Sequence, residues 1–313
     1  MAYGAVTTDN VPLDILRTEM LRGIERYNET SRDFKSIFAN QTTKNKVRVY
    51  QRTKAFKNMG SDTTVPDMQR MDYQEISLAD PLRWGLKSAV TQESLDYGIS
   101  SEDVRAEHAE ALAADKRLIT QICVEAMLVD GGWWDETAAP PAYKSNTFAS
   151  THDHYLPYNA TGVLDTSHVA AAKRHIKEHG FGENLVLFLN GAQVEDIESA
   201  VEFSSAKPSE MMDKIMELGV RPEAMVSGIP IIQEDWFPEN YALMVDLSVK
   251  PLYWRNPEGR AADGGLQVYD YPGDVQYNLN CDYVRYTSAT VGIRSAGVAI
   301  YLNSATWADP TII

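Results

Sequence analysis

Apolar residues recur at helical spacing between Ser101 and Val129, and this segment is the clearest element that the sequence predicts. Ser100 is suited to cap its N-terminus, with Asp103 three residues further on, and Gly131-Gly132 is suited to end it. Such a helix spans about 40 Å, which is long for a globular domain. One stripe carries the apolar side chains of Val104, Ala111, Leu112, Leu118, Ile119, Ile122, Ala126 and Met127.

Two segments with alternating polar and apolar residues precede this helix. Lys46–Tyr50 and Tyr73–Leu78 each alternate as strands do, and the turn-rich stretch Met59–Pro66 lies between them. We therefore predict a long two-stranded ribbon over about residues 46–80. Because an isolated ribbon of two strands is only marginally stable in water, we expect it to lie on a partner surface.

Helices and strands are mixed in the rest of the chain, which predicts the α+β class. A first helix starts near Pro12, and a polar arm follows it at 28–45. Beyond an irregular stretch at 131–164, helices are predicted at Thr166–His179, Gln193–Val201 and Ser209–Leu218. Strands are predicted at Asn184–Asn190, Ile229–Gln233, Tyr241–Asp246, Asp282–Thr290 and Val291–Leu302. A turn at Pro238–Asn240 is predicted to join the second of these strands to the third.

Charge is distributed unevenly along the chain, whose formal net charge is −15. Between Gln41 and Ser61 there are six basic residues and no acidic one, so the rest of the chain is more acidic than the total. A basic ribbon on an acidic body favours contacts between copies of the chain, although a solvated hairpin with incidental charge explains the pattern equally well. The candidate contact residues are Lys44, Lys46, Arg48, Arg52, Lys54 and Lys57.

Composition narrows the class of protein. The chain has 313 residues, of which 44% are hydrophobic, and this is enough for a sizeable core. The net negative charge argues against tight binding to nucleic acid, which needs a concentrated basic surface. No apolar run approaches the ~20 residues of a membrane span, and the first residues lack the features of a signal peptide. We therefore expect a protein made and used in a cytosol, without a membrane partner, in which Cys123 and Cys281 are buried thiols.

One motif suggests metal chemistry. His175, Glu178 and His179 form the pattern H-x-x-E-H, which on a helix places two imidazoles on one face to hold zinc, with the carboxylate as general base. However, His179 precedes Gly180 at the expected helix end, where the helix dipole alone accounts for a cation. Basic residues on the same turn also disfavour a dication: Lys173, Arg174 and Lys177. A zinc-dependent hydrolase therefore stays a minor alternative.

Other candidate sites are weaker. His152 and His154 form a second pair of potential ligands, but they lie in a predicted loop, where histidines are usually polar surface residues. The sequence has no Walker loop and no G-x-G-x-x-G, G-x-S-x-G or C-x-x-C motif. We therefore expect no catalytic residue, no cofactor and no bound metal.

The order of the predicted elements resembles that of a known family. An arm, a long ribbon, a long helix, an α/β lobe and a strand-rich return follow one another, as in the Hong Kong 97-like major capsid proteins of tailed bacteriophages. Four segments of the sequence carry the resemblance. The first runs from Glu75–Leu78 through Ser88–Tyr97 to Ser101–Val104, and the second is Asn184–Asn190 followed by Gln193–Ile197. The third is Gly228–Ile232 followed by Ala242–Leu247, as a strand and its hairpin partner, and the fourth is Asp282–Tyr301, with Arg294 near its end.

The resemblance implies a division of the chain into named parts. They are an N-terminal arm at 1–45, an E-loop ribbon at 46–80, a peripheral domain at 81–164 with a spine helix at 101–129, an axial domain at 165–277, and return strands of the peripheral domain at 278–313. In this family the E-loop lies across a neighbouring subunit. A basic ribbon on an acidic neighbour would therefore guide and align that contact.

The resemblance also implies a structural role and no enzymatic one. The implied role is that of a virion protein, which assembles in the host cytoplasm into an icosahedral head of hexamers and pentamers around double-stranded DNA. The implied partners are other copies of the chain, a portal protein, separate scaffolding and decoration proteins, and packaged DNA through weak contact. Because the arm is short, we expect no cleaved scaffold within the chain. An encapsulin-type nanocompartment, which encloses a protein cargo with the same fold, remains the first alternative.

Overall fold

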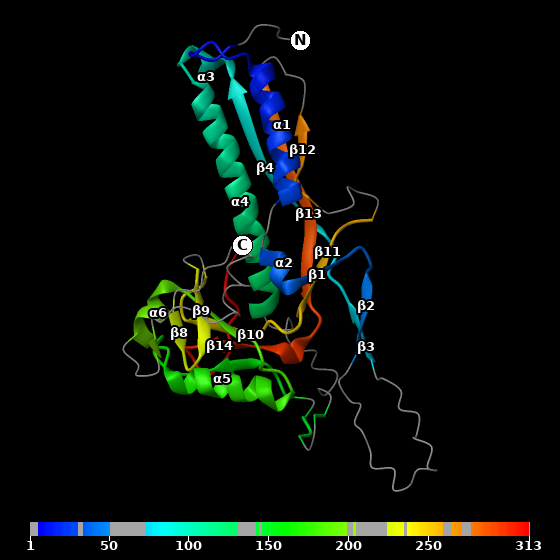
Figure 1. Ribbon diagram of the computed structural model, residues 1–313, viewed down its shortest axis with the longest axis vertical. Helices are drawn as coiled ribbons and strands as arrows, with labels where there is room; N and C mark the ends of the chain where they lie inside the picture. The colour runs from blue at the N-terminus through cyan, green and yellow to red at the C-terminus, as the bar shows by residue number, and fades with distance from the viewer. Residues whose placement is uncertain are drawn as a thin grey trace.

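The computed structural model shows an elongated molecule with an upper lobe, a lower lobe and a projecting ribbon (Figure 1). The predicted helix Ser209–Leu218 and the glycine pair at 131–132 lie outside the residues that it describes. Those residues are 6–30, 34–50, 73–129, 142–143, 146–149, 151–198, 203–204, 224–234, 237–258, 265–270 and 277–312.

Helix α4 (Ser101–Leu128) confirms the long helix that the sequence predicts. Its N-terminus is closed by a capping box, because Ser100 accepts a hydrogen bond from the backbone N–H of Asp103 and donates its own backbone N–H to the Asp103 carboxylate at 2.8 Å. The helix ends at Leu128, and Val129 is extended. Of the predicted stripe, five residues are buried: Val104, Ala111, Ile119, Ile122 and Met127.

The sheet of the upper lobe is built on one long strand, β13 (Tyr277–Val291). This strand pairs antiparallel with three others, which are β4 (Leu82–Thr91), β12 (Gln267–Asp270) and β11 (Leu252–Arg255). Strand β11 also pairs parallel with β1 (Ala39–Thr42). The upper sheet is therefore made from segments that lie far apart in the sequence.

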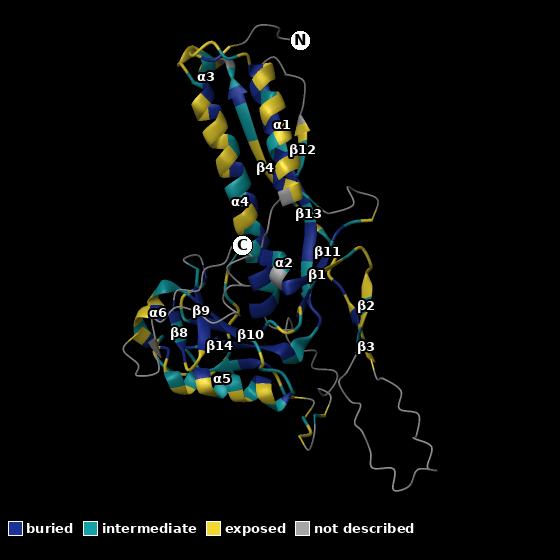
Figure 2. Ribbon diagram, viewed as in Figure 1, coloured by how far each residue is buried: buried dark blue, intermediate teal, exposed yellow. Residues whose placement is uncertain are grey.

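Three further helices complete the upper lobe. Helix α1 (Leu13–Thr30) lies beside α4, and their outer faces are exposed in Figure 2. Helix α2 (Phe34–Phe38) packs on α4 just before β1, and α3 (Gln92–Asp96) follows β4. The apolar residues that recur at helical spacing in α1 form its buried face: Leu13, Leu16, Met20, Ile24 and Tyr27.

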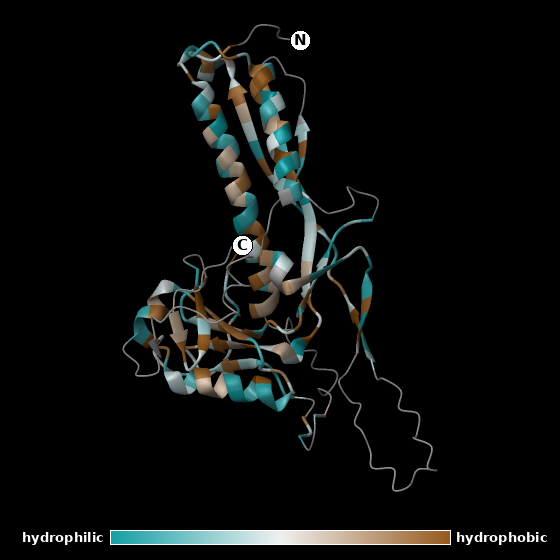
Figure 3. Ribbon diagram, viewed as in Figure 1, coloured by the Kyte–Doolittle hydropathy of each residue, from teal (hydrophilic) through white to brown (hydrophobic). Residues whose placement is uncertain are grey.

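The lower lobe is an α/β unit around a sheet of seven strands. Helices α5 (Thr166–Glu178) and α6 (Gly191–Glu198) pack on it, and Figure 3 shows hydrophobic residues concentrated in its strands. A short 3-10 helix, Arg294–Ala296, leads into its strand β14. In spatial order the strands are β5 (Tyr155–Pro157), β14 (Gly297–Tyr301), β10 (Tyr241–Asp246), β6 (Leu185–Leu189), β9 (Ile229–Gln233), β8 (Ala224–Val226) and β7 (Phe203–Ser204).

The predicted hairpin between Ile229–Gln233 and Tyr241–Asp246 is wrong. Strand β6 lies between β9 and β10, parallel to β9 and antiparallel to β10. The antiparallel neighbour of β9 is instead β8, and Ser227 and Gly228 join the two with φ values of 49° and 76°. Two residues with positive φ make the tight turn that suits a hairpin, whereas the longer connection from β9 to β10 leaves room for a strand between them.

Each of the two sheets takes strands from several distant segments of the chain. Strands β11 and β12, within 165–277, belong to the upper sheet with β13. Strand β5, within 81–164, and strand β14, within 278–313, belong to the lower sheet. The chain thus crosses between the lobes several times, and residues 292–296 carry it from β13 to β14.

Asp246 holds the loop that leads into β6. Its side chain is fully buried and accepts hydrogen bonds from the backbone N–H groups of Gly182, Glu183 and Asn184 at 2.5, 3.2 and 3.3 Å, and from Ser248 at 2.8 Å. Burial alone would raise the pKa of this carboxyl, but the backbone hydrogen bonds outweigh burial and lower the pKa.

We expect Asp246→Asn to lower the free energy of unfolding of the unassembled subunit by about 2–3 kcal/mol at pH 7, because an amide presents a donor where only acceptors fit. Since the folded-state pKa is lowered, the carboxylate stabilises the fold above the unfolded pKa of about 3.9 and this stabilisation is lost as the pH falls further. Urea unfolding at several pH values measures both effects. A difference between variant and wild type that stays constant down to acidic pH would contradict this account.

Two other properties can be read from the described residues. Cys123 and Cys281 are buried thiols that are not joined in a disulfide, as the sequence predicts. Among the helices that the structure describes, none is long and apolar enough to cross a membrane.

Candidate functional site

The predicted ribbon is formed by β2 (Lys46–Tyr50) and β3 (Tyr73–Ser77), which pair antiparallel with Lys46 opposite Ser77 and Tyr50 opposite Tyr73. The two strands form a sheet of their own, and they project from the body (Figure 1). Within β3 only Ile76 is buried. A two-stranded ribbon with so little buried surface is only marginally stable without a partner surface.

Two of the six candidate contact residues lie in the described strands of the ribbon. The Lys46 ammonium contacts Glu75 at 3.2 Å, and Nε of Arg48 lies 3.9 Å from the same carboxylate. The guanidinium of Arg48 also lies 4.7 Å from the centre of the Tyr73 ring. These ion pairs are about half exposed, so each contributes at most about 1 kcal/mol.

The other candidates are placed as follows. Lys44 is exposed in the segment between β1 and β2. Arg52, Lys54 and Lys57 lie outside the described residues, and their role stays a prediction. The structure thus brings Lys46 and Arg48 together around one carboxylate, and the basic excess of the ribbon is smaller at its base than the sequence alone indicates.

Sequence reasoning missed Arg255, which fixes the base of the ribbon to the body. Its Nη1 donates to the carbonyl oxygens of Leu78 and Ala79 at 3.3 and 3.0 Å and to Asp80 at 2.7 Å. The backbone of Ala79 bonds in addition to the side chains of Thr290 and Ser288 on β13. The end of β3 is therefore held on β11 and β13, which leaves the ribbon to extend from a fixed base.

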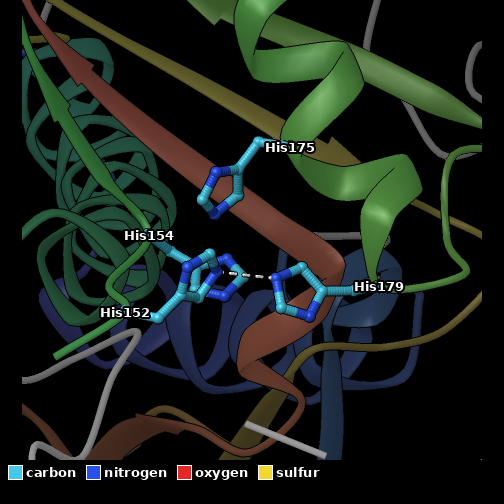
Figure 4. A group of neighbouring side chains, drawn as sticks. All are labelled: His152, His154, His175 and His179. Atoms are coloured by element: carbon cyan, nitrogen blue, oxygen red, sulfur yellow. Dashed lines mark hydrogen bonds between the residues drawn. The ribbon is translucent and has the colours of Figure 1, made fainter. Parts of the chain in front are cut away.

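The two histidine pairs of the sequence form one cluster in the lower lobe. His152 and His154 precede β5, and His175 and His179 lie on the last turn of α5 and its C-cap (Figure 4). One nitrogen of each ring lies within 4.8 Å of those of the other three. The sequence did not join the pairs, because more than twenty residues and a strand separate them.

Packing and backbone hydrogen bonds orient the rings of the cluster. Nδ1 of His154 lies 2.8 Å from the carbonyl oxygen of Gly297, and Nε2 of His152 lies 2.9 Å from Nε2 of His179. The rings of His152 and His175 stack at 4.7 Å with an interplanar angle of 4°. The ring of His179 also stacks on that of Phe148, with the two ring centres 4.0 Å apart.

Burial lowers the pKa of every histidine in the cluster, which argues against the expectation that the helix dipole holds a cation at His179. Burial, followed by the neighbouring His152 and His175, lowers the pKa of His179 to about 3. Burial likewise lowers the pKa of His175 to about 4 and that of His154 well below its ordinary value. The pKa of His152 is lowered as well, again chiefly by burial.

Glu178, the general base of the hypothetical hydrolase, is not part of this cluster. Its carboxylate lies 3.9 Å from Nε of Arg174, and the side chain is 43% exposed. The H-x-x-E-H motif therefore supplies its two histidines to the cluster without the carboxylate that a zinc hydrolase needs.

Comparison with known proteins shows similarity in structure but not in sequence. No protein-family model matches the chain, and no curated protein does. A chain of Mycobacterium phage Patience matches with a TM-score of 0.67 and 19% identity, covering 98% of this chain and 92% of that one. The asymmetric unit of the bacteriophage PhiM1 mature capsid matches with a TM-score of 0.56 and 12% identity, covering 86% and 87%.

A third match is the capsid of the native GTA particle, with a TM-score of 0.53 and 12% identity over 87% of this chain and 90% of that one. At such identities the likeness concerns the fold. It extends over most of both chains in every case, so it includes both lobes. The chain has the mixed helix-and-sheet fold of the Hong Kong 97-like capsid proteins.

Proposed function

We propose that this chain is the major capsid protein of a tailed bacteriophage, which assembles into an icosahedral head of hexamers and pentamers around double-stranded DNA. The observation that carries the proposal is the fold, which matches the Patience chain over 98% of this chain. The proteins whose capsids match it are shell subunits and not enzymes, and the separation of Glu178 from the histidine cluster agrees with a structural role.

The ribbon supports assembly through contacts between copies of the chain. It projects from the body with exposed Lys44 and Lys46 near its base, and the rest of the chain is acidic. An exposed basic ribbon that buries little of itself gains stability by lying on an acidic neighbour. The expected contact residues are those named from the sequence, Lys44, Lys46, Arg48, Arg52, Lys54 and Lys57.

The proposal is tested by the size of the particle that the chain forms. The full chain without an affinity tag would be produced alone, separated by size-exclusion chromatography and imaged by negative-stain electron microscopy. We expect closed particles of megadalton size, or assembly intermediates that close when a scaffolding protein is supplied. A monomer or dimer that persists over a wide range of salt concentrations, with and without that protein, would contradict the proposal.

Enclosure of a genome, as opposed to a protein cargo, needs a separate test. Genes for a portal protein and a terminase beside the gene for this chain would support a phage head, whereas a neighbouring gene for a cargo enzyme would support a nanocompartment. Particles purified from infected cells would contain DNA in the first case and a second protein in the other.

Charge reversal in the ribbon is expected to slow assembly. In the triple variant Arg52→Glu, Lys54→Glu, Lys57→Glu the ribbon would repel an acidic neighbour, and we expect the assembly rate to fall roughly tenfold or more at low salt. Light scattering during assembly measures the rate. Added salt should reduce the difference between variant and wild type, because it screens exposed charges.

The matched control retains the charge at the same positions: Arg52→Lys, Lys54→Arg and Lys57→Arg. Its assembly rate should lie close to that of the wild type, and circular dichroism should show that all variants fold. Equal rates for the reversed and the charge-retaining variants would show that the basic ribbon does not guide assembly.

A further inference from the structure

The strongest unexplained feature of the molecule is the histidine cluster, His152, His154, His175 and His179 (Figure 4). Among the described residues it is the one group of three or more histidine, cysteine or acidic side chains placed to share a metal ion. Shell assembly does not require four neutral imidazoles to converge beside α5. The proposed assembly therefore does not account for this cluster.

Two of the four rings, those of His154 and His175, are held by backbone carbonyl groups. Because a carbonyl oxygen can only accept, Nδ1 of His154 must donate to Gly297, and this places the lone pair of His154 on Nε2. His175 has a backbone hydrogen bond of the same kind to Asp153, while its Nε2 is buried without a hydrogen-bond partner among the described residues. Imidazoles that ligate metals are typically held in this way, with the outer nitrogen bonded to a carbonyl group.

The distances within the cluster suit a small ion. Zn–N bonds of about 2.0–2.1 Å in a tetrahedron separate the ligand nitrogens by ~3.4 Å. The Nε2 atoms of His152 and His179 are 2.9 Å apart, and the widest separation in the group is 4.8 Å. Small rotations of the side chains would bring these separations to the tetrahedral value.

The charges around the cluster act on a cation in both directions, and two of the three basic residues on this turn are engaged with other groups. Lys173 donates to the carbonyl oxygen of Ser227 at 3.2 Å, Arg174 lies beside Glu178, and Lys177 is exposed. The carboxylates of Asp153 and Glu178 act on His152 and favour positive charge there, while Arg174 acts on His175 in the opposite direction.

We propose that His152, His154, His175 and His179 bind one divalent transition-metal ion of the zinc class, in a closed structural site. Imidazole nitrogens are suitable ligands for Zn²⁺ and Co²⁺, and four of them fill a tetrahedral coordination sphere, so no position remains for a reacting water. Burial supports the proposal, because His154 and His179 are almost wholly shielded from water where the four ligand nitrogens converge.

The ion would join parts of the lower lobe that are distant in sequence. His154 lies next to β5, and its carbonyl oxygen accepts the backbone N–H of Ala299 on β14. His175 and His179 belong to the end of α5. Metal binding would thus fix the end of α5 to the β5–β14 edge of the sheet, and it would stabilise the folded chain by mass action.

The test uses the full chain without a histidine tag, loaded with Zn²⁺ or Co²⁺ and then desalted. We expect close to one ion per chain by elemental analysis, and Co²⁺ should give the intense visible absorption of a tetrahedral site. Removal of the metal with a chelator should lower the thermal midpoint by ~5 °C. A metal content far below one ion per chain after loading, or a weak octahedral Co²⁺ spectrum, would overturn the proposal without any variant.

Variants then assign the ligands. The double variant His175→Gln, His179→Gln should lose the bound ion and the effect of the chelator. The matched control is His168→Gln on the same helix, where His168 accepts the backbone N–H of Asp165 in a capping box that glutamine can retain. The control should keep the ion, and equal metal content in the double variant would overturn the assignment.

Discussion

Replacing Asp115 by alanine is expected to lower the free energy of unfolding by about 3–5 kcal/mol, one of the two largest effects of a single substitution in this chain. The Asp115 side chain is 4% exposed and lies in the middle of α4. It accepts two hydrogen bonds of 2.6 Å from Nε and Nη2 of Arg285 on β13, and one of 2.8 Å from the hydroxyl of Tyr27 on α1. The substitution would leave the guanidinium of Arg285, itself 2% exposed, without its carboxylate.

Two further variants separate loss of the ion pair from loss of packing. In Glu110→Ala, also on α4, only an exposed ion pair with Arg117 is removed, and we expect a change of at most about 1 kcal/mol. In the double variant Asp115→Leu, Arg285→Met both charges are replaced by apolar groups, and much of the lost stability should return. Urea unfolding of the unassembled subunit measures all of them. A double variant less stable than Asp115→Ala would contradict the assignment of the loss to an uncompensated charge.

Replacing Trp254 by alanine is expected to cost about 3–5 kcal/mol as well, because it would open a large cavity. The Trp254 side chain, on β11, is fully buried in the core cluster shared by the two lobes, together with Phe38 of α2 and Phe188 of β6. The ammonium of Lys35 lies 5.5 Å from the centre of its ring. The loss would therefore affect the packing of β11, α2 and β6 together.

The matched variant is Trp254→Phe. The indole Nε1 of Trp254 is buried and has no hydrogen-bond partner among the described residues, so phenylalanine removes a buried donor along with some volume. We expect this variant to cost only about 1–2 kcal/mol, since the removal of the unpaired donor offsets part of the cavity. Chemical unfolding followed by circular dichroism compares the two. Equal losses for phenylalanine and alanine would contradict the assignment of the loss to the size of the cavity.

Elements with local causes are predicted well from the sequence. The long helix begins where Ser100 and Asp103 form their capping box, and both residues can be recognised from sequence alone. The buried face of α1 and the two strands of the ribbon follow from the spacing of apolar residues. In each case the interaction that determines the element lies within a few residues of it, or within one alternating strand.

Pairing between distant segments is predicted poorly. The sequence places Ile229–Gln233 next to Tyr241–Asp246, but nothing near these strands records that β6 lies between them. Asp115 occurs among polar residues of α4, and no feature of the sequence points to Arg285, 170 residues away, as its partner. The histidine cluster could not be predicted for the same reason, because the sequence shows two separate pairs of histidines and only the fold brings them together.

The place of β14 determines when the lower lobe can fold during synthesis. Residues 297–301 form an inner strand between β5 and β10, although both of those strands are made much earlier. Until the ribosome has added them, β10 is an unpaired edge of the sheet and β5 lacks the strand with which it pairs. Unpaired edges are prone to pair with other chains. A nascent chain that stalls before residue 297 is therefore expected to need chaperone protection, and a competent subunit appears only when nearly the whole described chain has been translated.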